Sequence, residues 1–230
     1  MIYNPESEWR ALREIRVSSV SVFIFDRRPL RPLHRPLHIP PRLRHPPGPR
    51  RLPLRHLPPP RRRRPAAYPA LDDVDAILIT GSKHSAYLDD EWILALTDYT
   101  RKALDSRRVR VVGICFGHQI VGRALDAGVA KNDRGWEVAV TEVDLTDEGK
   151  KIFGLEKMNI QQMHRDQVCT FPSDAVPLGS TDICAVQAMY APRRYFSVQG
   201  HPEFTEDIVR EISRGGMATA SSRTNSTTML

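Results

Sequence analysis

Short apolar runs alternate with amphipathic segments through the second half of the chain. Residues 76–80 (Ala-Ile-Leu-Ile-Thr) and 109–114 (Val-Arg-Val-Val-Gly-Ile) are typical of buried strands. Between them, residues 91–107 carry apolar side chains at helical spacing, with acidic residues at the start and basic residues at the end. This order of elements predicts an α/β fold, with a mostly parallel sheet and helices on both faces.

Weaker patterns extend this prediction along the chain. We expect further strands over residues 137–145, 158–168, 182–190 and 194–199. Helices are expected over residues 118–125, over 147–152 and from Thr205 onward. Residues 17–25 alternate well enough to supply a first strand within residues 1–26, and residues 214–230 read as a flexible tail.

Residues 27–66 interrupt the pattern. They contain 13 Arg and 13 Pro and no acidic residue, so they cannot build a core and are expected to be disordered. The whole chain has 230 residues and a formal net charge of +7, yet without this segment it has 21 basic and 27 acidic residues. Three interpretations stay open: a basic arm for nucleic acid or acidic partners, a solvated linker, or a stretch translated from a wrong reading frame.

Composition excludes several other classes. No apolar run approaches the roughly 18–20 residues of a membrane span, and the first residues lack the pattern of a secretory signal. Three cysteines without CxxC spacing fit a reducing, cytoplasmic location, and Cys169 and Cys184 are expected in the core. The chain has no HExxH, Walker or GxGxxG pattern, so neither a metal nor a cofactor is expected.

The strongest chemical signal is Gly113-Ile114-Cys115-Phe116-Gly117, which joins a predicted strand to a predicted helix. It has the form of a nucleophile elbow with cysteine as the nucleophile. The turn is so tight that side chains in place of either glycine would collide. A thiol at the start of a helix is expected to have a lowered pKa, and the Phe116 N–H is placed to stabilise an oxyanion.

A thiol nucleophile needs a base and a group that orients the base. The segment Gly200-His201-Pro202-Glu203 follows the apolar strand at 195–199. His201 and Glu203 are two residues apart on an extended segment, so both side chains can point the same way. These residues predict a catalytic triad of Cys115, His201 and Glu203.

These motifs resemble the class I glutamine amidotransferase family, and in particular its stand-alone, GMP-synthase-amidotransferase-like group. The resemblance covers about residues 67–213 in family order. The Cys and His-Pro-Glu motifs are its most specific parts. The supporting motifs are Ile79-Thr80-Gly81-Ser82, Gly135-Trp136-Glu137-Val138 and Gln162-Met163-His164-Arg165-Asp166.

The resemblance implies a flavodoxin-like amidotransferase fold and a set of further roles. The backbone N–H of Gly81 would join that of Phe116 in an oxyanion hole. Gln119 would lie beside the glutamine pocket, and His164 and Asp166 would hold the amino-acid end of the substrate. The implied reaction is hydrolysis of the γ-amide of glutamine or of a γ-glutamyl compound through a thioester. One option is that the ammonia passes to a partner synthetase.

Two alternatives to this function stay open at the level of sequence. One is a γ-glutamyl peptidase acting on glutathione-like conjugates, as similar stand-alone plant proteins do. The other is a binder of nucleic acid or acidic partners through the basic segment, with the amidotransferase fold as an inactive scaffold. Nucleic acid is the less favoured partner, because no aromatic residue is interleaved with the arginines.

The N-terminal part departs from the family pattern. The family begins with a strand, a helix and a second strand before the Ile79-Thr80-Gly81-Ser82 strand, and the basic segment occupies that region here. We therefore expect a degraded or atypical N-terminal part, a sheet that lacks an edge strand and a covering helix, and exposed apolar surface.

Overall fold

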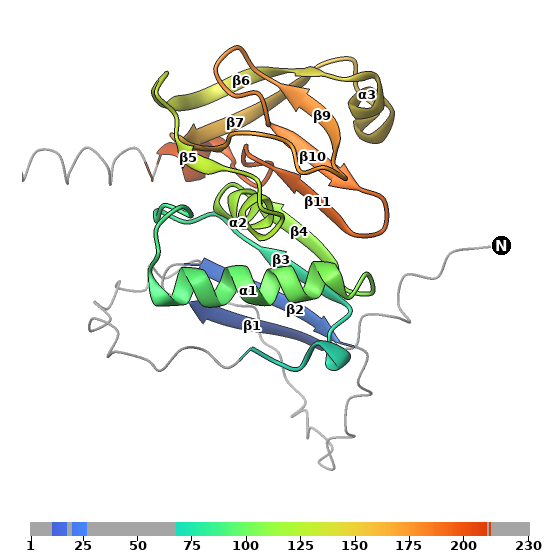
Figure 1. Ribbon diagram of the computed structural model, residues 1–230. Coiled ribbons are helices and arrows are strands. Elements are labelled where there is room, and N and C mark those ends of the chain that lie inside the picture. Colours follow the sequence, from blue (N-terminus) through green and yellow to red (C-terminus); the bar gives the residue numbers. More distant parts are fainter. Residues whose placement is uncertain (1–10, 18–19, 27–67, 211, 213–230) are drawn as a thin grey trace, which may run out of the picture.

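The computed structural model describes residues 11–17, 20–26, 68–210 and 212. Its main feature is a nine-stranded sheet in the order β1-β2-β3-β4-β11-β10-β9-β6-β7, shown from β1 to β7 in Figure 1. A second sheet pairs β5 with β8. The strands are β1 Ala11–Val17, β2 Val20–Asp26, β3 Ala76–Ile79, β4 Arg110–Ile114, β5 Val129–Lys131, β6 Glu137–Leu145, β7 Met158–His164, β8 Asp166–Val168, β9 Val176–Ser180, β10 Ala188–Ala191 and β11 Tyr195–Val198.

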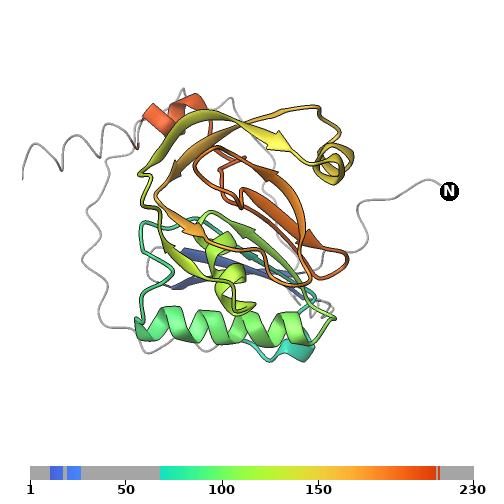
Figure 2. The same ribbon diagram turned by 45° about the horizontal axis from the view of Figure 1, so that its top comes forward.

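The three α-helices are α1 Glu91–Asp105, α2 Phe116–Ala124 and α3 Asp147–Phe153, and a 3-10 turn covers Leu71–Asp73. α1 and α2 pack against each other and both contact β4, so they share one face of the sheet. α3 packs on β9 and β6. Residues 206–210 are also helical. In Figure 2 the yellow and orange strands curl away from the face that α1 covers.

The expected α/β class is confirmed, but the sheet is more mixed than expected. Only β3 with β4 and β4 with β11 pair in parallel among the named strands. Parallel neighbours need a long crossover, which α1 supplies between β3 and β4, whereas β10 and β11 are joined by a short turn and pair antiparallel. The described helices α1 and α2 also lie on one face rather than on both.

The N-terminal expectation is corrected in one respect. A strand is present where the pattern indicated one, at Val20–Asp26, and it pairs antiparallel with β3 while β1 pairs with β2. The open edge of β3 is therefore occupied, because a hairpin stands where the family pattern has a strand, a helix and a strand. The expected disordered segment at 27–66 and the tail at 214–230 lie outside the described residues.

The core that supports the motif region lies between the sheet and its two helices. Ile77 and Ile79 of β3 and Val111 of β4 point toward this core, and Ile93 and Ile120 meet them from α1 and α2. These side chains are buried, so the end of β4 is held on two sides. The position at which β4 becomes α2 is therefore rigidly placed.

One local expectation in the curled part of the sheet is corrected, and another is confirmed. The expected strand at 182–190 is replaced by β9 and β10, and residues 182–185 form an irregular turn between them. The expected strand over 137–145 is present as β6, but Val138 and Val140 are exposed on it and Glu137 is buried. Glu137 and Val143 are the buried residues of β6, so the buried side of this strand carries a carboxylate.

No helix among the described residues has both the length and the apolar character that crossing a bilayer requires.

Candidate active site

Cys115 sits at the turn from β4 into α2 with φ 52° and ψ −102°. A positive φ is unfavourable for a residue with a side chain, so the strained elbow expected from the sequence is confirmed. A Cβ on Gly113 would lie 2.5 Å from the Gly117 carbonyl oxygen, and one on Gly117 would lie 2.1 Å from the Ile79 carbonyl oxygen. Both glycines are therefore sterically required.

The register of two parallel strands brings the predicted base to the nucleophile. Ile114 of β4 pairs with Val198 of β11, and the Cys115 N–H donates to the Val198 carbonyl at 2.9 Å. His201 follows β11 by three residues, as Cys115 follows β4 by one. Both side chains line the same cleft.

His201 is oriented as the sequence predicts. Its Nδ1 lies 2.8 Å from Glu203 Oε1, and its ring stacks on Phe204 with centroids 3.9 Å apart. Its backbone N–H donates to the Gln161 carbonyl at 2.8 Å. The imidazole is buried while about half of the Glu203 side chain is exposed. Because the carboxylate occupies Nδ1, Nε2 is the nitrogen left to exchange a proton.

The expected lowering of the Cys115 pKa is wrong for this state of the protein. Burial raises the pKa of the Cys115 thiol to about 12 and outweighs the hydrogen bond from the Phe116 N–H, which lowers the pKa. The charges of Glu203 and Asp166 raise this pKa further. Cys115 is therefore a neutral thiol at neutral pH rather than a free thiolate.

Gly81 lies against both members of this pair. A Cβ on Gly81 would be 2.8 Å from His201 Cε1 and 3.7 Å from Cys115 Cβ. The imidazole cannot move away from Gly81 without breaking its hydrogen bond with Glu203 or its stacking on Phe204. The backbone of Gly81 therefore borders both His201 and Cys115.

The variant Gly81→Ala should consequently lower kcat by about 10–100-fold, because the new methyl group displaces the imidazole from the thiol. Steady-state kinetics on a γ-glutamyl substrate measure this effect, with a thermal melt to show that the fold survives. An unchanged kcat would mean that the methyl group is accommodated and that the close contact has no catalytic consequence.

The predicted substrate-binding residues are held by a buried polar network. The Gln119 Nε2 amide donates to the Asp166 carbonyl at 3.0 Å and to Gln199 Oε1 at 3.1 Å. His164 Nδ1 also faces the Asp166 carbonyl, at 3.1 Å. Gln119, His164 and Asp166 all line the cleft, so the structure brings the three together.

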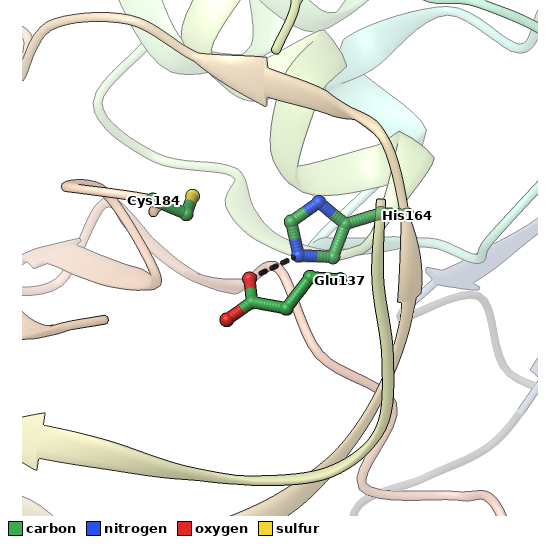
Figure 3. Close-up of side chains that lie close together, drawn as sticks. All are labelled: Glu137, His164 and Cys184. Carbon is green, nitrogen blue, oxygen red and sulfur yellow. Dashed lines mark hydrogen bonds and ion pairs between the residues drawn. The ribbon is translucent and has the colours of Figure 1, made fainter. Parts of the chain in front are cut away.

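His164 is engaged on its other side by a carboxylate that the sequence reasoning did not assign. Glu137 Oε2 lies 2.9 Å from His164 Nε2, and both side chains are buried. Figure 3 marks this contact with a dashed line. Gln187 Nε2 donates to the same Glu137 oxygen at 2.6 Å. The signal in the sequence was an acidic residue at an inward position of a strand, within the quoted motif Gly135-Trp136-Glu137-Val138.

Glu137, His164 and Cys184 lie close enough together to be considered as metal ligands. Both nitrogens of His164 already face oxygen atoms of the protein, the Asp166 carbonyl and Glu137 Oε2, so neither nitrogen is left open to a metal ion. The Cys184 thiol is likewise engaged, because its sulfur faces the Val186 carbonyl at 3.8 Å. The cluster fits a buried ion pair between Glu137 and His164 better than it fits a metal site.

The pKa of Glu137 is consistent with this pairing. Burial pushes the pKa up, but the hydrogen bonds from His164, Thr181 and Gln187 and the charge of His164 outweigh burial and leave it below 4.5. A depressed carboxyl pKa stabilises the fold above the ordinary pKa of 4.5, and this stability is lost as the pH falls through the folded-state value.

We therefore expect Glu137→Gln to lower the free energy of unfolding by about 2 kcal/mol at pH 7. The difference from the unsubstituted protein should shrink as the pH falls below 4.5. Denaturant titrations at a series of pH values measure it. Glu142→Gln is the matched control on the same strand, because Glu142 pairs with Lys157 at the exposed surface and should cost under about 0.5 kcal/mol. Equal effects of both variants would contradict a buried ion pair.

The other two cysteines differ from each other. Cys184 is buried as expected, whereas Cys169 is exposed, so its predicted place in the core is wrong. Cys169 follows the short edge strand β8, and its backbone N–H donates to the Gly128 carbonyl at 2.7 Å. This leaves its side chain at the surface, away from the cleft residues.

The chain is similar in sequence to a known family and to several of its members. Residues 62–209 match the family model described as glutamine amidotransferase class-I. A glutamine amidotransferase-like protein of Schizosaccharomyces pombe is 42% identical over 152 residues, which cover 64% of this chain and 61% of that protein. Gamma-glutamyl peptidase 3 of Arabidopsis thaliana is 32% identical over 62% of this chain and 59% of its own length.

Solved structures agree on the fold. A glutamine amidotransferase from Thermotoga maritima matches with a TM-score of 0.57 at 16% identity, over 68% of each chain. The chain spans about three fifths of the length of the curated relatives it matches. The matched region includes the elbow, the His201–Glu203 pair and the buried network behind them, and the chain therefore belongs to the class I glutamine amidotransferase family.

Proposed function

We propose that this protein hydrolyses the γ-amide bond of glutamine or of a γ-glutamyl compound through Cys115, His201 and Glu203. The observation that carries the proposal is the pairing of β4 with β11, which sets a strained cysteine beside an imidazole already bonded to a carboxylate. A structural role would not require a cysteine at φ 52° together with that pair.

The proposed reaction begins with transfer of the Cys115 proton to His201 Nε2 and attack of the sulfur on the γ-carbonyl carbon. The Gly81 and Phe116 N–H groups stabilise the oxyanion that forms. The tetrahedral intermediate collapses as His201 returns the proton to the leaving amine, which gives a γ-glutamyl thioester on Cys115. Water, deprotonated by His201, then attacks the thioester and releases glutamate and the free thiol.

A γ-glutamyl peptidase is the second candidate, and the shape of the cleft favours it. The cleft has a volume of about 690 Å³, which is in the range that takes ligands larger than an amino acid. Its lining includes three apolar side chains, those of Trp136, which is 61% exposed, Met163 and Ile212. Apolar side chains of this kind suit a substituent beyond the γ-glutamyl group.

The test compares glutamine with γ-glutamyl dipeptides as substrates of the purified chain, with glutamate release as the measurement. The proposal predicts glutamate from at least one of them, accompanied by an equal amount of ammonia or amino acid. A higher kcat/KM for dipeptides with an apolar second residue would support the peptidase. Folded protein that releases glutamate from neither class would contradict the proposal.

The assignment of partners is part of the same proposal. A synthetase subunit that accepts the ammonia is consistent with one solved relative from Thermoplasma acidophilum, whose description names it as part of a GMP synthase. A cytoplasmic location stays a prediction from the cysteine pattern. Binding of nucleic acid by residues 27–66 stays the less favoured alternative, and this segment lies outside the described residues.

A further inference from the structure

Gln199 is a buried carboxamide beside the nucleophile that the proposed reaction does not yet use. It follows β11 just as Cys115 follows β4, and the preceding residues Val198 and Ile114 are register partners. Gln199 and Cys115 therefore occupy neighbouring positions at the same end of the sheet. The exposed fraction of Gln199 is 0%, so water does not satisfy its amide.

The orientation of this carboxamide is fixed by its oxygen. Gln199 Oε1 accepts a hydrogen bond from Gln119 Nε2 at 3.1 Å. The second amide hydrogen of Gln119 goes to the Asp166 carbonyl, and that carbonyl also faces His164, which Glu137 holds. The oxygen of Gln199 is thus tied to a buried network, and its Nε2 amide points elsewhere.

Gln199 Nε2 has no hydrogen-bond partner among the described residues, although it is buried. An unsatisfied buried donor costs about 1–3 kcal/mol. An acceptor that forms at one stage of the reaction would offset this cost. Gln199 is close enough to act on the thiol, because Gln199 and Cys115 follow register partners on neighbouring strands and Gln199 is one of the influences that lower the pKa of Cys115. A neutral thiol is a weak acceptor, whereas a thiolate is a strong one.

We propose that Gln199 Nε2 donates a hydrogen bond to the Cys115 sulfur once that sulfur has passed its proton to His201, and so stabilises the thiolate. The proton moves from Sγ to His201 Nε2, the negative charge stays on sulfur, and Gln199 keeps both of its amide hydrogens. The inference rests on the proposed function, because it assigns a catalytic residue to the same site.

The test is the pH dependence of Cys115 alkylation by iodoacetamide, which reports the thiolate and needs no substrate. Peptide mass mapping separates Cys115 from the exposed Cys169. Gln199→Met removes the donor and should raise the midpoint of the alkylation profile by about one pH unit, with an approximately tenfold lower rate at pH 7. Gln199→Glu keeps the shape and the acceptor for Gln119 but adds a negative charge, so it should raise the midpoint at least as far.

Gln162→Met is the matched control. Gln162 is an equally buried carboxamide whose Nε2 amide donates to Gln187 Oε1 at 3.0 Å, so its loss should leave the alkylation profile unchanged. An unshifted midpoint in the folded Gln199 variants, or an equal shift in Gln162→Met, would overturn the inference. A shifted profile in a protein that hydrolyses no γ-glutamyl compound would support Gln199 and refute the proposed function alone.

Discussion

Replacing Cys115 with alanine should lower kcat/KM for the γ-glutamyl substrate by at least about 10³-fold while leaving the fold in place. The loss is large because the sulfur forms the covalent intermediate, and the remaining groups supply only binding and oxyanion stabilisation. The fold should survive because the buried thiol contributes little packing volume beyond a methyl group. Glutamate release under saturating substrate is the measurement.

Cys169→Ala serves as the control, because Cys169 is an exposed cysteine away from the cleft. It should keep full activity and the same melting temperature as the unsubstituted protein. Residual activity in Cys115→Ala near the original level would show that hydrolysis uses another nucleophile. A large fall in melting temperature would instead mean that the cysteine is needed for packing.

Gly117→Ala should lower the free energy of unfolding by about 4 kcal/mol or more. A Cβ at this position would lie 2.1 Å from the Ile79 carbonyl oxygen and 2.9 Å from Ile79 Cβ, on the central strand β3. Neither the strand nor the first turn of α2 can move without opening the core between them. The steric overlap is therefore relieved only if the packing of α2 on β3 is disrupted. Denaturant unfolding followed by circular dichroism measures the effect.

Gly128→Ala is the matched control for this glycine. A Cβ there would meet its nearest neighbour, Cys169 Cβ, at 3.5 Å, which is an ordinary contact. We expect its effect on the free energy of unfolding to stay within about 1 kcal/mol. Similar stabilities for the two alanine variants would contradict the account of the elbow as a sterically closed turn.

The strands and helices around the elbow could be predicted from the sequence, because the sequence patterns in this region all indicate the same elements. The apolar run at β3, the Gly-x-Cys-x-Gly spacing and the periodicity of α1 each indicate the structure observed. That Cys115 and the His201–Glu203 pair lie at one end of the sheet was predictable for the same reason, since both motifs directly follow apolar strands. Their meeting depends only on β4 and β11 being parallel neighbours.

The mixed sheet and the buried network could not be predicted in the same way. Strand order depends on long-range pairing, and nothing local in residues 11–26 indicates that a hairpin pairs with β3. Glu137 and Gln199 are polar residues whose partners, His164 and Gln119, are distant in sequence. The Cys115 pKa depends on burial, which the motif alone does not report.

The most direct test of the central claim is covalent labelling with a diazoketone analogue of glutamine. The account predicts a single adduct on the peptide that contains Cys115, suppressed by excess γ-glutamyl substrate and absent from Cys115→Ala, with Cys169 unmodified. Folded protein that shows no adduct at Cys115, or that carries the label mainly on Cys169, would contradict the assignment of Cys115 as the nucleophile.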